Sequence, residues 1–413
     1  IDTPLHAYVP KKHVDHMHPD AIIAIAASKN SKALTAEIFG DDIGWLPWKR
    51  PGYELGLWLE NFCLENPNAR GVVLESHGLF TWDDDAKTCY SLTLEIIQKA
   101  MDWFESKADS QPAFGGAVHE SLPPMKRRAV AAEIMPAIRG LICESQHMVG
   151  HFNDSPEVLE FVNAQQLQEL AALGTSCPDH FLRTKICPLV VDFNPNAQDV
   201  QVVINRLPQE IDDYRNAYRA YYARCKHADS PALRDPNPIV YLLPGVGMIT
   251  FAKDKATARI SGEFYVNAIN VMRGASSVSE YTGLLEQEAF DIEYWALEEA
   301  KLQRMPKPKS LAGRIALITG AAGGIGSATA QKYLSEWACV MLADIDGDGL
   351  SAAAARLKSQ YGQDVVRAVV LHVTRDAEIP AAFPTTVLEF GGLDIVVSNA
   401  RIASSAPIDE TTL

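Results

Sequence analysis

A glycine-rich run between an apolar segment and a helical segment constrains this chain more than any other feature. The run is Thr319-Gly-Ala-Ala-Gly-Gly-Ile-Gly326; it follows the apolar segment 314–318 and opens a segment, 327–337, that we expect to be helical. Glycines leave the backbone bare, so a pyrophosphate can approach the N-terminus of the helix, where unpaired N–H groups favour negative charge. The run therefore predicts a dinucleotide site on an α/β sheet.

A second apolar strand strengthens this prediction. Residues 337–343 read as a buried strand, and Asp344 follows them directly. An acid about twenty residues past the glycines accepts hydrogen bonds from the adenosine ribose and repels a 2′-phosphate. The sequence therefore favours NAD over NADP.

Together with the segment Gly392 to Ala400, these residues resemble the short-chain dehydrogenase family. The resemblance implies a doubly wound parallel Rossmann sheet. Two residues depart from the family pattern: Arg401 replaces a glycine, and His372 stands where an aspartate is usual. The family's catalytic Ser and Tyr-x-x-x-Lys come later, and no Tyr-x-x-x-Lys follows Asn399, so we expect an incomplete dehydrogenase that binds a nucleotide without transferring hydride. The implied cofactor-binding residues are Thr319, Gly320, Gly324, Ile325, Gly326, Asp344 and Asn399.

A second candidate site lies near the start of the chain. In His16-Met-His18 the two imidazoles lie on one face of a strand, because side chains alternate along it. His77, which comes just after the apolar run Gly71–Leu74 and before a glycine, is the best third ligand. Three histidines leave one position of a tetrahedral zinc open for water or substrate. A histidine pair without metal is the alternative, and His13 is either a further ligand or a surface residue.

The wider pattern resembles the class II aldolase and ribulose-phosphate epimerase family. It consists of Asp2-Thr-Pro-Leu-His6, His16-Met-His18-Pro-Asp20 and Ser76-His77-Gly78. The resemblance implies zinc on His16, His18 and His77, with Asp2 as the catalytic carboxylate that moves a proton. The aldolases have Glu in place of Asp2, so this feature is closer to the epimerases. The resemblance to the family also implies phosphate-binding residues upstream of Asp2 and assembly into a homo-oligomer.

Two polar segments, 106–116 and the Pro- and Lys-rich 305–310, divide the chain. We predict a zinc domain at 1–108, a middle domain at 117–302 and a dinucleotide domain at 311–413. Segment 73–88 resembles 242–257 at one constant offset, with Val246 in the place of His77, and His18-Pro-Asp20 resembles Cys177-Pro-Asp179. The middle domain is either a metal-less repeat of the first or an unrelated unit that shares turn chemistry.

Composition limits the class of protein. The chain has 413 residues, a length that is enough for two or three domains. Of these residues 47% are hydrophobic, which allows each domain a core. Its net charge of −15 without a basic run argues against nucleic-acid binding, and no apolar run reaches the roughly 18 residues of a membrane span. Seven cysteines without a regular framework predict reduced thiols in a cytoplasmic protein. The start Ile1-Asp-Thr-Pro is not an initiator methionine or a signal peptide, so we expect both ends to be cut edges.

Taken in order, the domains resemble the bifunctional rhamnulose-1-phosphate aldolase/alcohol (lactaldehyde) dehydrogenase family. Leu243-Pro-Gly-Val-Gly247 and the stretch Glu263 to Ala268 share in this resemblance. It implies zinc-dependent cleavage of rhamnulose 1-phosphate to dihydroxyacetone phosphate and lactaldehyde, followed by NAD-dependent oxidation or reduction of the aldehyde. A sugar-phosphate epimerase and a non-catalytic remnant remain the alternatives.

Overall fold

The computed structural model describes residues 3–107 and 112–401, which form mixed α/β structure as the sequence predicts. The chain divides into two compact units. The first comprises Ile1–Arg127, Asn153–Ile249 and Ile260–Met305; the second comprises Arg128–Phe152, Thr250–Arg259 and Pro306–Leu413. The predicted middle segment 117–302 thus contributes to both. In the described ranges, no helix has the length and apolar character needed to cross a membrane.

The first sheet has four strands in the order β1-β4-β3-β2. Strand β4 runs antiparallel to β1 and to β3, whereas β2 and β3 are parallel. The strands are β1 (His13–Met17), β2 (Ile43–Leu46), β3 (Gly71–Leu74) and β4 (Gly78–Asp83).

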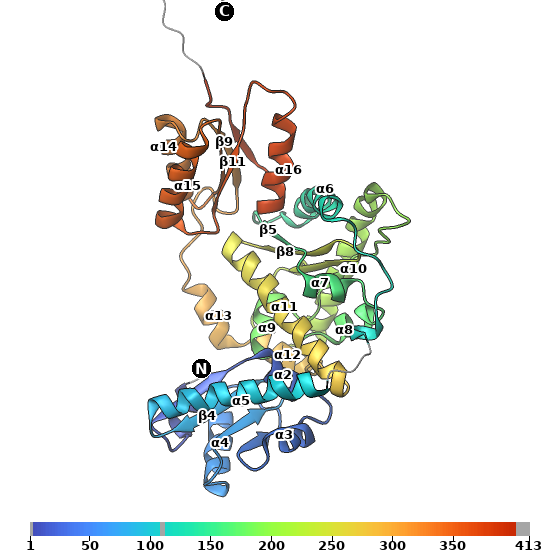
Figure 1. Cartoon of the computed structure of the whole chain (residues 1–413), viewed down its shortest axis with the longest axis vertical. Helices are drawn as coiled ribbons and strands as arrows, with labels where there is room; N and C mark the ends of the chain where they lie inside the picture. The colour runs from blue at the N-terminus through green and yellow to red at the C-terminus, as the bar shows by residue number, and fades with distance from the viewer. Residues whose placement is uncertain (1–2, 108–111, 402–413) are drawn as a thin grey trace, which may run out of the picture. The chain divides into compact units, whose positions relative to one another are not determined.

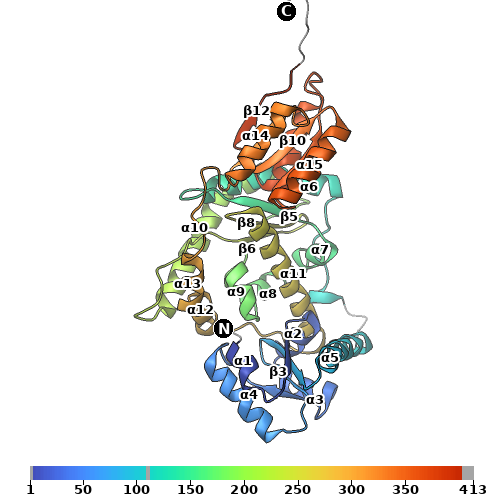
Figure 2. The same cartoon turned by 90° about the vertical axis from the view of Figure 1, so that its left-hand side faces the viewer.

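Helices cover both faces of this sheet because both faces of its central strands are apolar. Val73 and Leu79 pack with α2, α3 and α5, whereas the alternate residues Val72 and Phe80 pack with α1 and α4. Figure 2 shows α1 and α4 on one side of β3 and α2, α3 and α5 on the other. The helices are α1 (Thr3–Tyr8), α2 (Asp20–Ala26), α3 (Ser31–Phe39), α4 (Tyr53–Glu65) and α5 (Ala86–Lys107).

The second sheet repeats the strand order of the first, as β5-β8-β7-β6. Its strands are β5 (Val149–Asn153), β6 (Leu189–Val190), β7 (Val240–Leu243) and β8 (Gly247–Ala252). The elements β7, β8 and α11 each begin the same number of residues after β3, β4 and α5, respectively. This constant offset supports a repeat. The helical segments are η1 (Ala113–Gly115), α6 (Pro124–Ile142), α7 (Pro156–Val162), α8 (Leu167–Leu173), α9 (Pro178–Thr184), α10 (Val200–Cys225), α11 (Lys255–Val278), α12 (Glu286–Glu293) and α13 (Ala296–Gln303).

One part of the predicted repeat is wrong. His18 to Asp20 connect β1 to α2, and their counterparts are therefore Asp154 to Pro156, which connect β5 to α7. Cys177-Pro-Asp179 instead opens α9, which comes two helices later. The shared Pro-Asp reflects the preference of both residues for the start of a helix.

The third sheet lies in the second unit and is parallel throughout, in the order β11-β10-β9-β12. Helices α14 and α15 lie on one side of it and α16 on the other (Figure 1). Ile318 and Leu342 pack toward α14 and α15, whereas the alternate residues Leu317 and Met341 pack toward α16. The elements are β9 (Ile315–Thr319), α14 (Gly324–Ser335), β10 (Cys339–Asp344), α15 (Gly347–Tyr361), β11 (Val366–Val370), α16 (Ile379–Phe390) and β12 (Ile395–Val397).

Candidate metal centre and nucleotide site

The antiparallel pairing of β1 with β4 brings the three predicted zinc ligands together. His16 lies in β1 opposite Phe80, His18 follows the last residue of that strand, and His77 lies in the turn between β3 and β4. A Cβ on Gly78 would come within 2.5 Å of the His18 ring and 2.6 Å of the Met17 carbonyl oxygen. Glycine at this position therefore permits the close approach of His18 to the turn.

The ligand atoms of His16, His18 and His77 all lie within 4.8 Å of one another. The Nε2 atoms of His16 and His18 are 3.0 Å apart, and the His77 ring centroid lies 4.9 Å from that of His16 and 5.1 Å from that of His18. In residues 3–107 and 112–401 this is the one group of three or more His, Cys, Asp or Glu side chains with metal-site spacing. Three histidines would hold a zinc ion and would leave one ligand position for a water or substrate oxygen.

Two of the three histidines have the protonation state that suits a metal site. Burial first, and then His18, lower the pKa of His16 to about 3. Burial also lowers the pKa of His77, as do His16 and His18. Both rings are therefore neutral at pH 7, which is the form that binds a metal. Burial opposes a charge on His18, but Cys177 and Asp179 outweigh it and raise its pKa to about 10.

Hydrogen bonding around the cluster also fits zinc. His16 Nδ1 lies 3.1 Å from the Leu79 carbonyl oxygen, which orients that ring and leaves Nε2 toward the other histidines. His77 is 3% exposed, and its Nδ1 has no hydrogen-bond partner. A buried imidazole without its partners is costly. A bound cation is one way to offset that cost.

Other residues near the first site have structural roles or lie elsewhere. Asp2 falls outside the described residues. Asp20 accepts hydrogen bonds from Asn267 and Asn270, and His13 is exposed and does not belong to the cluster. Asp85, the residue just before α5, caps that helix, because its Oδ1 accepts from the backbone N–H and the hydroxyl of Thr88.

In the second unit, the glycine-rich turn connects β9 to α14 as the sequence predicts. Gly320 has φ +66°, and a Cβ there would come within 2.8 Å of Asn399 Nδ2. A Cβ on Gly326 would lie 2.2 Å from the Gly320 carbonyl oxygen, whereas one on Gly324 would meet no heavy atom within 4 Å. Gly320 and Gly326 therefore make the turn possible, and Gly324 keeps the approach to the helix open.

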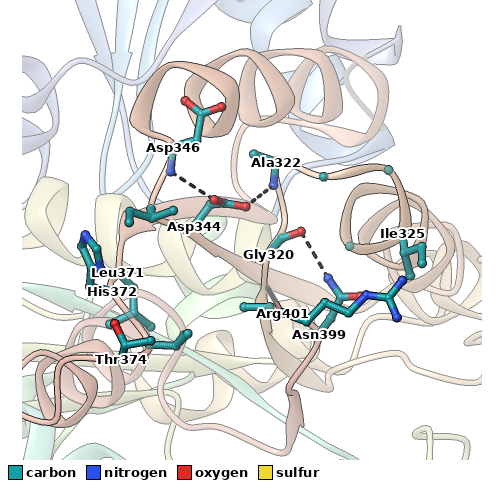
Figure 3. Close-up of a pocket in the computed structure, with 16 residues that line it drawn as sticks. Gly320, Ala322, Ile325, Asp344, Asp346, Leu371, His372, Thr374, Asn399 and Arg401 are labelled. Atoms are coloured by element: carbon teal, nitrogen blue, oxygen red, sulfur yellow. Dashed lines mark hydrogen bonds between the residues drawn. The ribbon is translucent and has the colours of Figure 1, made fainter. Parts of the chain in front are cut away.

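The turn opens on a cavity of about 720 Å³ at the carboxyl end of β9 (Figure 3). The chain continues from β9 to β10 on one side and reaches β12 on the other, so the cavity lies where the strand order reverses. Ligands of doubly wound folds bind in this place. Six of the seven predicted cofactor residues line the cavity, namely Gly320, Gly324, Ile325, Gly326, Asp344 and Asn399.

The seventh, Thr319, lies below the turn and joins β9 to β12. Its hydroxyl accepts hydrogen bonds from the backbone N–H groups of Asn399 and Ala400. The side-chain amide of Asn399 in turn donates to the carbonyl oxygens of Thr319 and Gly320. The geometry thus gives Thr319 a supporting position.

The two residues that depart from the expected pattern, His372 and Arg401, both line the cavity. Figure 3 shows Arg401 near Asn399 and Ile325, at the glycine-rich end, and His372 near Thr374, at the other end. Compared with the glycine and aspartate that are usual in the family, Arg401 adds a positive charge to the cavity wall and His372 removes a negative one.

Three protein families match consecutive parts of the chain. The class II aldolase and adducin N-terminal domain matches residues 1–103, the second domain of class II aldolases matches 129–302, and the short-chain dehydrogenase family matches 314–413. The chain carries class II aldolase domains fused to a short-chain dehydrogenase domain. Domains of these kinds indicate an enzyme.

The chain matches only part of the length of each relative. The uncharacterized oxidoreductase YuxG of Bacillus subtilis is 39% identical over 413 residues, which is 100% of this chain and 60% of YuxG. Galactitol 2-dehydrogenase of Agrobacterium fabrum is 43% identical over 102 residues, or 25% of this chain and 38% of that protein. D-threitol dehydrogenase of Mycolicibacterium smegmatis is 38% identical over 103 residues, or 25% and 39%. The chain therefore spans less than two thirds of each relative.

Two features of the aldolase domains escaped the sequence analysis. Asp179, from the second aldolase domain, lies with Oδ2 2.9 Å from His18 Nδ1. The second feature is a cleft of about 540 Å³ next to the histidines, where the Trp48 ring lies 6.4 Å from the His77 ring. The cleft is lined by Trp48, Lys49, Arg50, Pro51, Gly52, Tyr53, Glu54, Trp58, Glu288, Asp291 and Trp295. Neither feature has a local sequence signal, because each joins residues that are distant in the chain.

Proposed function

We propose that the aldolase part cleaves a ketose 1-phosphate with the help of zinc, and that the dehydrogenase part binds NAD. Hydride transfer to or from an alcohol or aldehyde would also need the family's Ser and Tyr-x-x-x-Lys, and no Tyr-x-x-x-Lys follows Asn399 in this sequence. The observation that carries the first half is the convergence of His16, His18 and His77 within 4.8 Å. Zinc held there supplies a Lewis acid that polarises the substrate carbonyl. In this proposal the catalytic carboxylate that moves the proton is Asp2.

The cleft beside His77 is the proposed place for the sugar chain. Three tryptophans, Trp48, Trp58 and Trp295, line it together with charged side chains. Arg50 lies over the Trp295 ring at 5.6 Å, and Lys49 lies over the Trp58 ring at 5.3 Å. Aromatic walls with a few charged groups suit a small polar ligand that has a carbon skeleton.

Asp344 supports NAD as the cofactor of the second half. It lies at the end of β10 on the cavity wall, where a carboxylate receives ribose hydroxyl groups and repels a 2′-phosphate. The names of two relatives, galactitol 2-dehydrogenase and D-threitol dehydrogenase, refer to sugar alcohols. They support a small hydroxylated substrate for the dehydrogenase domain.

Within this class, rhamnulose 1-phosphate is the proposed substrate, and dihydroxyacetone phosphate and lactaldehyde are the products. This choice rests on the resemblance of the whole domain order to the bifunctional family. Lactaldehyde would then be the substrate of the dehydrogenase activity of the whole protein. A fused pair of activities keeps the reactive aldehyde near the domain that consumes it.

The test begins with the zinc content per chain, measured by elemental mass spectrometry on the wild type and on His77→Ala. The matched control is His13→Ala, which removes an exposed histidine from the same strand as His16. We expect about one zinc per chain in the wild type and in the control, and little in His77→Ala. A folded wild type that takes up no zinc contradicts the proposal.

Zinc-loaded protein is then incubated with rhamnulose 1-phosphate, and dihydroxyacetone phosphate is quantified with a coupled enzyme. Triose phosphate formed by wild type and by His13→Ala, but not by His77→Ala, supports the aldolase. Zinc binding with isomerisation of a pentulose phosphate, and without triose phosphate, identifies an epimerase instead.

A further inference from the structure

The carboxylate of Asp179 lies against the candidate zinc ligand His18. The distance from Asp179 Oδ2 to His18 Nδ1 is 2.9 Å, and the two residues are 161 positions apart in the sequence. Asp179 belongs to the first turn of α9, in the second aldolase domain, whereas His16, His18 and His77 all belong to the first. The second domain thus places a charged group beside a metal centre that it does not itself contain.

The contact uses the ring nitrogen of His18 that faces away from the cluster. Its other nitrogen, Nε2, lies 3.0 Å from His16 Nε2, at the centre of the three histidines. A metal-binding imidazole commonly bonds through its remaining nitrogen to a carboxylate or carbonyl, which fixes the tautomer and the orientation of the ring. His16 uses the Leu79 carbonyl in this way. Asp179 gives His18 the equivalent support, with a charged acceptor.

Neighbouring contacts hold the start of α9 against the first domain. Cys177 Sγ lies 3.7 Å from His18 Nδ1 and 3.7 Å from the His77 carbonyl oxygen. Asn267 of α11 bonds both to Asp20 and to His180, which follows Asp179 directly. The position of Asp179 is therefore fixed from both sides by contacts within the first unit.

The second domain has no histidine set of its own at the corresponding places. By the constant offset, Val246 stands where His77 stands in the first domain. Asp154, which follows β5 as His18 follows β1, pairs with Arg127 at 3.0 Å. The second aldolase domain therefore keeps the strand order of the first domain but not its histidine ligands. Its contact with the metal centre is made by Asp179.

We propose that Asp179 is a positioning residue of the zinc centre, through which the second aldolase domain completes the site of the first. The inference rests on the proposed zinc site. Asp179 holds His18 with Nε2 toward the metal and raises the basicity of the ring, so that the site binds zinc more tightly than three unsupported histidines would.

The test measures the zinc affinity of the full chain in competition with a chromophoric chelator. The variants are Asp179→Ala, which removes the acceptor, and Asp179→Asn, which keeps an oxygen of the same size without the charge. The control is Asp154→Asn, which breaks an ion pair of the same domain away from the three histidines. We expect about 10- to 100-fold weaker zinc binding for Asp179→Ala and a smaller loss for Asp179→Asn. The control should bind zinc as the wild type does.

Two further readouts separate positioning from a general structural role. The visible spectrum of the cobalt-substituted protein reports ligand geometry, and it should change in Asp179→Ala but not in Asp154→Asn. Thermal unfolding of the metal-free wild type and Asp179→Asn measures the part of the effect that does not depend on zinc, and the zinc affinity of Asp179→Asn should fall in addition to it. If instead this variant loses stability without zinc and keeps its affinity, Asp179 only joins the domains and the inference is wrong.

The inference is also overturned if both Asp179 variants bind zinc as tightly as the wild type. If Asp179→Ala does not fold, Asp179→Asn alone decides, because an amide of the same shape can keep one hydrogen bond to the ring. A wild type that fails to bind zinc contradicts the proposed function itself, and that result is obtained before any variant is compared.

Discussion

The carboxylate of Asp344 accepts a hydrogen bond of 2.9 Å from the backbone nitrogen of Ala322, in the glycine-rich turn. Its other oxygen accepts from the backbone nitrogen of Asp346 at 3.1 Å. Asp344 is proposed to bind the ribose of the nucleotide. It therefore also stabilises the glycine-rich turn, which is proposed to bind the pyrophosphate (Figure 3). A substitution at Asp344 would change both the binding of the nucleotide and the stability of the glycine-rich turn, so the two effects have to be separated.

Replacing Asp344 with alanine should weaken NADH binding about 10- to 100-fold, because hydrogen bonds to a charged acceptor are lost. Asp344→Asn keeps an acceptor for Ala322 but removes the negative charge, so it should improve NADPH binding relative to NADH while retaining the turn. Titration calorimetry with both nucleotides gives the ratio of affinities. Equal binding of NADH and NADPH by the wild type would contradict the proposed role of the acid.

The two glycines of the turn should respond differently to an added methyl group. In Gly326→Ala the Cβ would lie 2.2 Å from the Gly320 carbonyl oxygen, so the backbone must move, at a cost of about 1–3 kcal/mol. Gly324→Ala meets no atom within 4 Å and should keep the stability of the wild type. Chemical denaturation followed by circular dichroism measures both.

Nucleotide binding gives the complementary comparison for the same pair. Gly324 lines the cavity, so a methyl group there stands where the nucleotide is expected, and NADH affinity should fall although the fold is intact. Equal stabilities for the two variants would show that the close approach of Gly326 to Gly320 is unimportant.

Both candidate sites could be predicted from the sequence where their residues are consecutive or belong to a known pattern. The turn from Thr319 to Gly326 is such a segment, because its conformation depends on adjacent glycines. His16 and His18 are only two positions apart, and the pairing of β1 with β4 then brings them to His77. The helix after the glycines begins at Gly324, earlier than the predicted Ser327, because the turn itself supplies the first helical residues.

What could not be predicted depends on packing between distant segments. Nothing local to Asp179 indicates His18 as its partner, and the likeness of Cys177-Pro-Asp179 to His18-Pro-Asp20 suggested equivalent positions when the two segments in fact face each other. The supporting position of Thr319 follows from its contact with Asn399, which the order of the strands creates.

A buried ion pair in the second unit should be important for stability. Arg139 of α6 donates hydrogen bonds to both carboxylate oxygens of Asp394, at 2.9 and 2.7 Å, and to the carbonyl oxygens of Met148 and Gly313. Arg139→Met leaves the carboxylate buried without its partner and should cost about 3–5 kcal/mol. The exposed pair Lys332–Glu336 is the control, and Lys332→Met should have little effect. Urea denaturation measures the difference.

The same pair predicts a pH dependence. Burial would raise the pKa of Asp394, but Arg139 outweighs it and lowers the pKa below its usual value. The stability from this carboxylate is therefore present above about pH 4 and is lost as pH falls through the lowered pKa. The destabilisation in Asp394→Asn relative to the wild type should shrink in acid. A difference that stays constant from neutral pH to about pH 3 would contradict this assignment.

If zinc binds as proposed, its removal should destabilise the first unit, because the metal would bind the folded histidine cluster and not the unfolded chain. At a free zinc concentration 100 times the dissociation constant, the free energy of unfolding should rise by about 2.7 kcal/mol relative to the chelated protein. The His77→Ala variant, which lacks the buried ligand, should unfold at the same temperature with and without zinc, whereas His13→Ala should respond as the wild type does. Calorimetric scans of the three proteins, with zinc and with a chelator, make the comparison. A zinc response that persists in His77→Ala would place the stabilising metal elsewhere in the chain.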